Sequence, residues 1–442
     1  MSKLSHLLYT QRFLPLFITQ FFGAFNDNAF KNAFLIWFTY DMASKSSMDP
    51  ATLVSVAAGL FILPFFLFSA TAGQIADKYE RSKLTQIIKL VEIVLMLACA
   101  VCFYMQSVLG LLILLFFMGL QSTFFGPIKY SLLPEHLHKN ELLAGNGLIE
   151  IGTFLAILLG TLFGGLVVRT HQGLFWISVF VVLFACMGWL ASRNIPKAPI
   201  GDVNLTINKN IFKATWSIMA YAKHERTVWL SVLGVSWFWF IGSVVLTQFP
   251  TYAKDVIGGN EHTVTLFLTL FSIGIGLGSA WCNKLLKGKI NGKLVPYGSI
   301  GLTVAILAFV GSSFLYTVQR MHYLEHVLLY QDKILNVQEF FAVGLSSWAI
   351  VLSLLSLAIC AGLYIVPLYA IMQDRTEEKY MARVIAANNV INALFMVMAS
   401  VLMLVLFAMK ITLLQLFLIL ALANIPVYFI IRGVVQRRLK HA

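Results

Sequence analysis

The chain has 442 residues, of which 59% are hydrophobic and 12% are charged, and its mean hydropathy is +0.82. Soluble domains carry about 25% charged residues, so this composition excludes a water-soluble domain of this size. The apolar residues are enough for about twelve membrane spans of about 20 residues each. The composition therefore predicts an all-α polytopic membrane protein and excludes an enzyme held by a single anchor.

The net charge of +13 does not indicate a nucleic-acid-binding protein, because the basic residues separate apolar runs instead of forming a stripe. Five cysteines fall inside apolar stretches, and their odd number and spacing give neither a disulfide framework nor a zinc site. We expect no metal and no cofactor. No small-residue cleavage site follows the first apolar run, so we expect it to stay in the protein as a span.

Apolar runs of about 20 residues, separated by charges or turn signals, predict twelve spans. The first six are expected near 13–40, 53–75, 83–106, 108–130, 142–168 and 173–193. The other six are expected near 227–250, 263–286, 294–317, 344–372, 382–409 and 411–433. The predicted domains are an N-terminal six-helix bundle (1–193), a cytoplasmic linker (194–226) and a C-terminal six-helix bundle (227–442).

Lys and Arg residues predict the orientation, since cytoplasmic loops are enriched in them. With a cytoplasmic N-terminus, 24 of the 32 fall on the cytoplasmic side and 6 on the outer side. We therefore expect both termini in the cytoplasm; the alternative is an odd number of spans. The long outer connection 318–343 has mixed charge and no ligand pattern, and is expected to form a flexible loop or a surface helix. A basic C-terminal tail follows the last span.

A weak internal repeat relates the two halves. Asn146 and Glu150 in the fifth span correspond to Asn388 and Asn392 in the eleventh, each 242 residues later. Many transporters are built from repeated bundles. If the repeat is real, Glu150 and Asn392 occupy equivalent positions.

Ionisable residues within spans are costly and usually face a cavity or a partner. Asp27 and Lys31 lie one helical turn apart in the first span, so they form either a self-neutralising pair or part of a substrate or ion site. Lys89 and Glu92 are close enough to a span end to extend toward water or to pair locally. Lys129 and Glu150 complete the charged set of the N-terminal half. The span interiors of the C-terminal half instead carry Gln248, Asn388, Asn389 and Asn392 and many aromatic residues.

The connection after the second span resembles the signature loop of the major facilitator superfamily. It reads Gly73-Gln74-Ile75-Ala76-Asp77-Lys78-Tyr79-Glu80-Arg81-Ser82-Lys83. The resemblance implies the fold of that superfamily, with two six-helix bundles that this loop holds together on the cytoplasmic face. It assigns gating to Gly73, Asp77, Lys78 and Arg81. Glu80 stands where the family usually has Gly, which puts the tight turn in question.

Longer strings are similar to the bacterial lysophospholipid transporters of this superfamily, including the form fused to acyl-ACP synthetase and acyltransferase domains. The similarity covers most of the chain outside the linker, the 318–343 loop and the tail. The strings that carry it are 22–28 (FGAFNDN), 125–130 (FGPIKY), Leu133-Pro134, 150–154 (EIGTF), 237–240 (WFWF), 248–250 (QFP) and 386–389 (AANN).

This resemblance implies that the protein flips lysophospholipids such as lysophosphatidylethanolamine from the outer to the inner leaflet of the bacterial inner membrane by alternating access. We expect a monomer that uses a separate acyl-ACP synthetase and acyltransferase for reacylation, because this chain lacks the fused domains. A lysolipid head group needs both a cation and an anion. The candidate substrate-binding residues are Asp27, Asn28, Lys31, Lys129, Glu150, Gln248, Asn388, Asn389 and Asn392.

One alternative is a proton-coupled exporter of a drug, metabolite or siderophore on the same fold, with Asp27 or Glu150 as the protonated group. A membrane-embedded lipid-modifying enzyme is a second alternative. No HxxxxD motif, serine nucleophile motif or metal-ligand cluster supports the enzyme, so the sequence favours a transporter.

Overall fold

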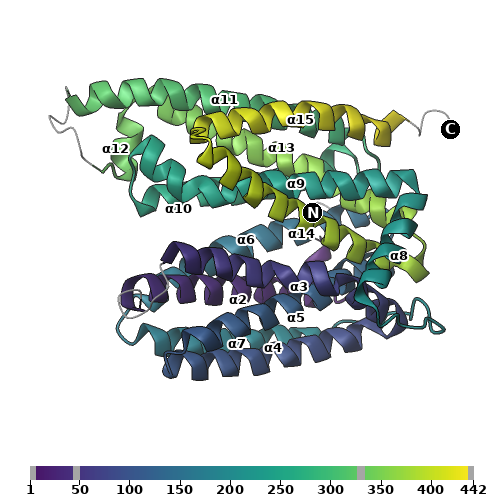
Figure 1. Cartoon of the computed structure of the whole chain (residues 1–442). Helices are drawn as coiled ribbons and strands as arrows, with labels where there is room; N and C mark the ends of the chain where they lie inside the picture. Colours follow the sequence, from purple (N-terminus) through teal and green to yellow (C-terminus); the bar gives the residue numbers. More distant parts are fainter. Residues whose placement is uncertain (1–5, 43–49, 326–333, 437–442) are drawn as a thin grey trace. The chain divides into compact units, whose positions relative to one another are not determined.

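The computed structural model describes residues 6–42, 50–325 and 334–436, and these segments are almost entirely helical. Figure 1 shows long helices that run lengthwise beside one another within each half of the chain. The first half of the chain forms α2 (Leu14–Trp37), α3 (Pro50–Lys78), α4 (Arg81–Tyr104), α5 (Val108–His136), α6 (Leu142–Val168) and α7 (Gly173–Ser192). These bounds agree closely with the first six predicted spans.

The second half forms another six long helices. They are α9 (Arg226–Thr251), α10 (Glu261–Leu285), α11 (Leu294–Tyr323), α13 (Leu345–Arg375), α14 (Met381–Ala408) and α15 (Leu413–Gln436). Among the described residues, eleven helices are long and apolar enough to cross a membrane. The twelfth, α2, has 24 residues, and its polar run at positions 26–32 lowers its hydropathy. The predicted all-α fold with twelve long helices is confirmed.

Two compact units divide the described chain. Unit 1 contains residues 1–232 together with 372–393, and unit 2 contains 233–371 together with 394–442. The end of α13 and the first half of α14 therefore belong with the N-terminal helices. The predicted domain boundaries at residues 193 and 226 stay a prediction.

Glycines allow α2 and α6 to approach closely within unit 1. Gly160 and Gly164 lie one turn apart on α6, and a Cβ on either would collide with a backbone carbonyl of α2, at Phe25 and Ala29 respectively. Small residues at this spacing let helix backbones pack closely in membranes, where lipid gives helices no hydrophobic reason to associate. This packing fixes the polar middle of α2 against α6.

In unit 2, glycines likewise let α10 and α13 approach each other closely. Gly274 and Gly278 are again four residues apart, and their missing side chains leave room for the backbone carbonyls of Leu355 and Ile359. Aromatic side chains fill the space around Tyr252, whose ring lies 4.8 Å from that of Phe309. The core of unit 2 is therefore closely packed and largely uncharged.

The linker between the two halves contains a helix that the sequence did not predict, α8 (Ile211–His224). The Asn210 side chain begins it by accepting a hydrogen bond from the Lys213 N–H. Three small or apolar side chains at helical spacing form its buried face and pack on α3 and α14. These are Ala214, Ile218 and Ala222. The opposite face exposes Phe212 and Trp216.

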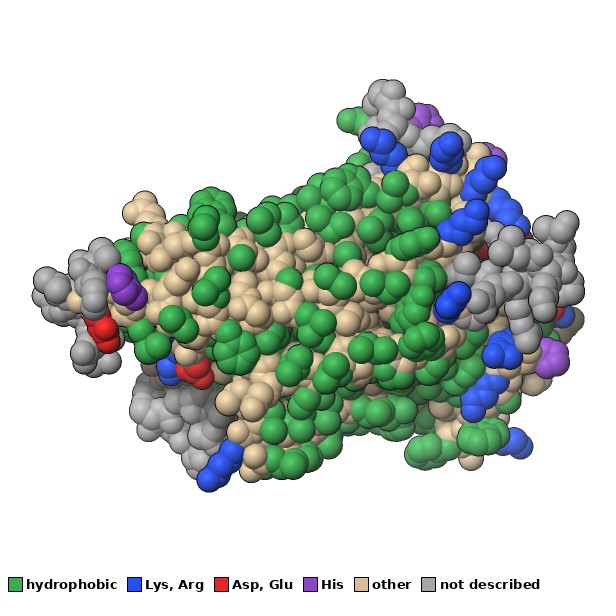
Figure 2. All heavy atoms as spheres, turned by 90° about the horizontal axis from the view of Figure 1, so that it is seen from above, with side chains coloured by type: hydrophobic (Ala, Val, Ile, Leu, Met, Phe, Trp, Pro, Cys, Tyr) green, Lys and Arg blue, Asp and Glu red, His purple; other side chains and the backbone are tan. Residues whose placement is uncertain are grey.

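The long connection predicted at 318–343 is partly helical. Helix α11 continues to Tyr323, and α12 (Val337–Ala342) begins with a capping box between Asn336 and Glu339. Residues 326–333 lie outside the described residues. In Figure 2, hydrophobic side chains cover the length of the helices on the visible face, and most of the Lys and Arg side chains gather toward one end.

Candidate functional site

Successive polar residues of α2 contact different neighbours, because each residue turns about 100° around a helix. The Asn26 side chain donates to the Val181 carbonyl (3.1 Å) on α7. Asp27 accepts a hydrogen bond from Ser122 Oγ (2.7 Å) on α5. Asn28 donates to the Ala24 carbonyl (2.8 Å) on its own helix. The polar run of α2 thus contacts both α7 and α5 within unit 1.

Lys31 does not form a close ion pair with Asp27 among the described residues. Its ammonium lies over the ring of Phe61 on α3, 5.4 Å from the centroid. The two charges still attract each other electrostatically, so the one-turn spacing brings them near each other. The Asp27 carboxylate is directed to Ser122, and Lys31 is free of any close carboxylate in the described part of the chain.

Lys129 on α5 and Glu150 on α6 form the second part of the site. Glu150 is fully buried, and its Oε1 accepts a hydrogen bond from the Tyr130 hydroxyl (2.8 Å). Its other oxygen, Oε2, has no partner among the described residues. The Lys129 ammonium lies 4.9 Å from the Tyr130 ring centroid and interacts electrostatically with both Glu150 and Asp27.

Lys89 and Glu92 on α4 belong to the same region. They are 1% and 2% exposed and form an ion pair at 2.6 Å. Of the two predicted alternatives, the structure confirms local pairing, because α2 and α5 cover both side chains and keep them from extending toward water. Six charged side chains from four helices form what we call the interior charge cluster: Asp27, Lys31, Lys89, Glu92, Lys129 and Glu150.

The asparagines of α14 lie in unit 1. The Asn389 amide lies against Gly126 of α5, where a Cβ would approach Asn389 Nδ2 to 2.7 Å. Asn388 is fully buried, and neither atom of its amide has a partner among the described residues. Asn392 is 8% exposed. Gln248 lies in unit 2, where its Nε2 is 3.4 Å from Met403 Sδ.

The repeat-related Asn146 is paired, in contrast to Asn388. Its Nδ2 donates to Gln373 Oε1 at 2.6 Å, and Gln373 Nε2 donates in turn to the Tyr130 carbonyl at 3.0 Å. These bonds tie the end of α13 to α5 and α6 within unit 1.

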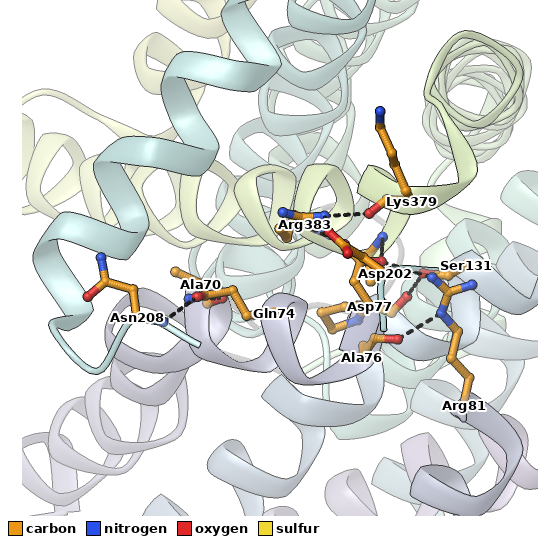
Figure 3. Close-up of polar contacts among 12 residues, drawn as sticks. Ala70, Gln74, Ala76, Asp77, Arg81, Ser131, Asp202, Asn208, Lys379 and Arg383 are labelled. Atoms are coloured by element: carbon orange, nitrogen blue, oxygen red, sulfur yellow. Dashed lines mark hydrogen bonds and ion pairs between the residues drawn. The ribbon is translucent and has the colours of Figure 1, made fainter. Parts of the chain in front are cut away.

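A second cluster lies at the connection between α3 and α4 (Figure 3). Asp77 is fully buried at the end of α3. Its carboxylate accepts bonds from the backbone N–H groups of Ala382 (2.9 Å) and Arg383 (3.2 Å) at the start of α14. The Arg383 side chain adds a bond through Nε at 2.8 Å. A carboxylate at the N-terminus of a helix is favourable because unpaired N–H groups and the helix dipole are directed at it.

Arg81 completes this arrangement from the first turn of α4. It donates to Asp77 Oδ1 (2.8 Å) and to the Ala76 carbonyl (2.9 Å), and it pairs with Glu135 of α5. Arg383 also reaches Asp202 of the linker at 3.3 Å. We call these five residues, Asp77, Arg81, Glu135, Asp202 and Arg383, the loop cluster.

The other two predicted gating residues have different roles. Gly73 lets α3 approach α14, since a Cβ there would lie 2.6 Å from Ala386 Cβ and 2.9 Å from the Ala382 carbonyl oxygen. The Lys78 ammonium lies 6.0 Å from the centroid of the neighbouring Tyr79 ring and takes no part in the loop cluster.

Glu80 explains how the chain turns without the usual glycine. Its backbone is extended (φ −63°, ψ 120°), a conformation that needs no glycine, and its side chain begins α4 by accepting from Ser82 N and Lys83 N. It also accepts from Ala198 N at 3.0 Å. Partial burial acts to raise the pKa of Glu80, but these N–H donors hold it below its ordinary value.

The sequence did not predict Arg383 and Glu135 of the loop cluster. It also did not predict Ser122 and Gln121, which contact the interior charge cluster, because uncharged polar residues are common in spans. Buried charges that need partners could have suggested them, since each charged residue in a span requires one.

Comparisons with known proteins agree with this architecture. The family model of the Major Facilitator Superfamily matches residues 16–400. The chain is 25% identical over 393 residues to the lysophospholipid transporter LplT of Klebsiella pneumoniae, covering 86% of this chain and 85% of that protein. It is also 25% identical over 388 residues to LplT of Photorhabdus laumondii, covering 85% and 83%.

Solved transporter structures share the fold. The human organic anion transporter MFSD10 superposes with a TM-score of 0.72 at 12% identity, covering 95% of this chain and 99% of that one. The Escherichia coli fucose:proton symporter FucP superposes with a TM-score of 0.68 at 12% identity, covering 97% and 100%. With twelve long helices, a matching signature loop and a family model spanning most of its length, this chain is a polytopic membrane protein that belongs to the Major Facilitator Superfamily.

Proposed function

We propose that this protein is a transporter that moves lysophospholipids, such as lysophosphatidylethanolamine, from the outer to the inner leaflet of the bacterial inner membrane. The observation that carries the proposal is the interior charge cluster, which presents both signs of charge within the spans of unit 1. The similarity to lysophospholipid transporters over most of the chain supports the same substrate. Reacylation would then fall to a separate acyl-ACP synthetase and acyltransferase.

The head group of lysophosphatidylethanolamine carries a phosphate and an ammonium. Lys129 and Lys31 supply cations for the phosphate, because neither is held by a close carboxylate in the described residues. Asp27 and Glu150 supply anions for the ammonium, and the unpartnered Oε2 of Glu150 is available as an acceptor. A single acyl chain needs an apolar environment, and the uncharged aromatic spans of unit 2, which contain Gln248, supply groups of that kind.

Transport would follow the alternating access expected of this fold, with the protein acting as a monomer and both termini in the cytoplasm. The loop cluster would act as the cytoplasmic gate. Asp77 is held by two N–H groups and two arginines, so opening at this end requires these charge-assisted bonds to break together. Re-forming them would stabilise the state that is open to the outer leaflet.

Uptake of labelled lysophosphatidylethanolamine into spheroplasts or proteoliposomes tests this proposal. Wild-type protein is compared with Asp27→Ala and Lys129→Ala, and with the exposed outer charges Lys254→Ala and Asp255→Ala as matched controls. All variants are checked for equal expression. We expect the wild type and both controls to move the lipid inward, and each site variant to lose at least about tenfold, as for a lost charge-assisted bond.

The same assay separates the alternative function. If the wild type moves no lysophospholipid inward under any ion gradient, the proposed substrate is wrong. Export of a small molecule that depends on a pH gradient and is lost in Asp27→Ala or Glu150→Gln would then favour the proton-coupled exporter.

A further inference from the structure

The ion pair between Lys89 and Glu92 supplies no direct contact with the lysolipid in the proposed head-group site. Both side chains lie on α4, three residues apart, and are 1% and 2% exposed. Their charged atoms, Nζ and Oε2, are 2.6 Å apart. A buried carboxylate without a cation is strongly unfavourable, and here the neutralising cation comes from the protein's own chain.

The surroundings of Lys89 provide a defined position for its ammonium. Gly23 of α2 lies directly opposite, and a Cβ there would collide with Lys89 Nζ. On another side the ammonium lies over the Phe125 ring, 4.8 Å from the centroid, where the negative face of the ring attracts a cation. The ammonium thus occupies a space formed by a missing side chain, a carboxylate and an aromatic face.

Two side-chain amides contact the same carboxylate. Glu92 accepts bonds from Gln121 Nε2 (2.9 Å) and Asn26 Nδ2 (3.3 Å). The carbonyl oxygen of the Asn26 amide, Oδ1, is buried and has no partner among the described residues. A carboxylate and an unpartnered amide oxygen are oxygen ligands of the kind that hard cations bind in proteins, and oxygen groups also coordinate sodium in transporter cores.

Hydrogen bonds connect this position to the proposed head-group site. Ser122 Oγ lies 3.2 Å from Gln121 Oε1 and 2.7 Å from Asp27 Oδ2, so its proton can be donated to either. Gln121 is in turn bonded to Glu92. The presence or absence of a cation beside Glu92 therefore influences how the Ser122 and Asp27 side chains are oriented. Asp27 also interacts electrostatically with both Lys89 and Glu92.

We propose that Lys89 is a tethered counter-cation, that is, a cation attached to the protein in place of a bound ion. Its ammonium occupies the position beside Glu92 where a small monovalent cation would otherwise bind. It thereby holds the hydrogen-bonded series Glu92, Gln121, Ser122 and Asp27 in place without a coupling ion. The link to Asp27 rests on the proposed function; the cation position does not. Removing the ammonium while keeping the carboxylate converts the position into a sodium site. Lys89 and Glu92 are then positioning residues that act on the substrate through Asp27.

Purified protein in detergent tests the cation position without any lipid substrate. Binding of radioactive sodium and the melting temperature are measured for wild type, Lys89→Ala and the double variant Lys89→Ala/Glu92→Gln, in sodium chloride and in N-methyl-D-glucamine chloride. We expect only Lys89→Ala to bind sodium and to melt higher in sodium, by on the order of 2 °C. The double variant has no carboxylate and should respond like the wild type.

Lysophospholipid uptake then tests the positioning role. Wild-type uptake should be equal in the two salts, and Lys89→Ala uptake should fall about tenfold in N-methyl-D-glucamine and recover in sodium. Sodium binding by Lys89→Ala without any lysophospholipid uptake by the wild type would support the cation position while overturning the proposed function.

The opposite results would overturn the inference. Sodium-independent melting and uptake by Lys89→Ala would show that no cation is needed beside Glu92. If Lys89→Ala and the longer Lys89→Met both fail to fold in sodium while the double variant folds, sodium cannot replace the ammonium, and Lys89 only balances charge.

Discussion

The interiors of the two units differ in how they pair polar groups. Unit 1 buries a network of ionisable side chains around α2, α4, α5 and α6. Unit 2 pairs neutral groups: Trp237 Nε1 donates to Asn424 Oδ1 at 2.7 Å, and Asn424 Nδ2 donates to the Ser299 carbonyl at 2.7 Å. Both units are built from long apolar helices held together by closely packed glycines, so the difference lies in their polar contacts and not in their architecture.

This difference indicates a division of roles. Neutral hydrogen bonds between spans contribute modestly to stability, on average about 0.6 kcal/mol each, and are sufficient to hold helices in register. A buried ion pair usually stabilises no better than an apolar pair of the same size. Packing alone therefore does not explain Asp27, Lys31, Lys129 and Glu150, whereas the proposed binding of a zwitterionic head group would explain them.

The largest effect is expected for Glu92→Ala. This change leaves the Lys89 ammonium buried without its carboxylate and removes the acceptor for Gln121 and Asn26. Breaking one side of a buried pair costs about 3–5 kcal/mol, so the melting temperature in detergent should fall sharply.

Removing both charges in Lys89→Leu/Glu92→Leu should recover most of that loss, because two apolar side chains replace the pair. A double variant as unstable as Glu92→Ala would contradict the explanation by an uncompensated charge.

Asp77→Asn is expected to have the next largest effect. The neutral amide places an N–H group where Arg383 or Ala382 now donates, so at least one charge-assisted bond is lost, at about 1.5–3 kcal/mol. Hydrogen exchange of the backbone at the start of α14 should accelerate by at least about tenfold. The exposed Lys83→Ala is the control, and equal acceleration in both variants would show that Asp77 does not hold α14.

In unit 2, Asn424→Leu should have a smaller effect. It removes the acceptor of Trp237 and the donor to Ser299 and Thr303, yet all of these groups are neutral. We expect a loss of about 1 kcal/mol in thermal unfolding, from the average strength of such bonds in membranes. A loss as large as that of Glu92→Ala would remove the distinction between the two interiors.

The smallest effect concerns acid stability at the edge of unit 1. Partial burial acts to raise the pKa of Glu141, but hydrogen bonds from Arg12 and the His138 N–H and the charge of Arg12 hold it below its ordinary value of 4.5. The folded state therefore favours the carboxylate. This stabilisation is fully present above the unfolded pKa and is lost as the pH falls through the lower folded value.

Because Arg12 and Glu141 are partly exposed, the contribution should be under about 1 kcal/mol. It can be measured as the change in melting temperature between neutral pH and pH below 4.5. Glu141→Gln should flatten that dependence, and an unchanged dependence would show that the bidentate contact with Arg12 does not stabilise the protein.

The sequence predicted the spans well because each span must be apolar over a length set by the membrane. The bounds of α6, predicted as 142–168, match the structure, and α10 begins two residues from its predicted position. Helix α8 was missed because it is short and only one face is buried, so its apolar residues do not form a continuous run.

The candidate site was predicted in part. The charge types and their restriction to the N-terminal half could be identified from the sequence, since an ionisable residue is rare in any span. The partner of each charged side chain could not be identified from the sequence. Asp27 bonds to Ser122, 95 residues away, and Asp77 bonds to Arg383, 306 residues away, and no local spacing encodes contacts between helices so distant in the chain.

The sequence by itself determined the number and limits of the long helices and the sign and number of charges within them, because these depend on composition over single segments in an apolar solvent. Only the tertiary structure decided which charges are paired. Lys89 could have reached water or Glu92, and the choice depends on Gly23 and Phe125 from two other helices covering it. Glu80 stands at the turn in an extended conformation that needs no glycine, and only the folded structure brings Ala198 of the linker to donate to its carboxylate. Partners of buried polar groups are set by packing between helices, and that packing exists only once the chain has folded.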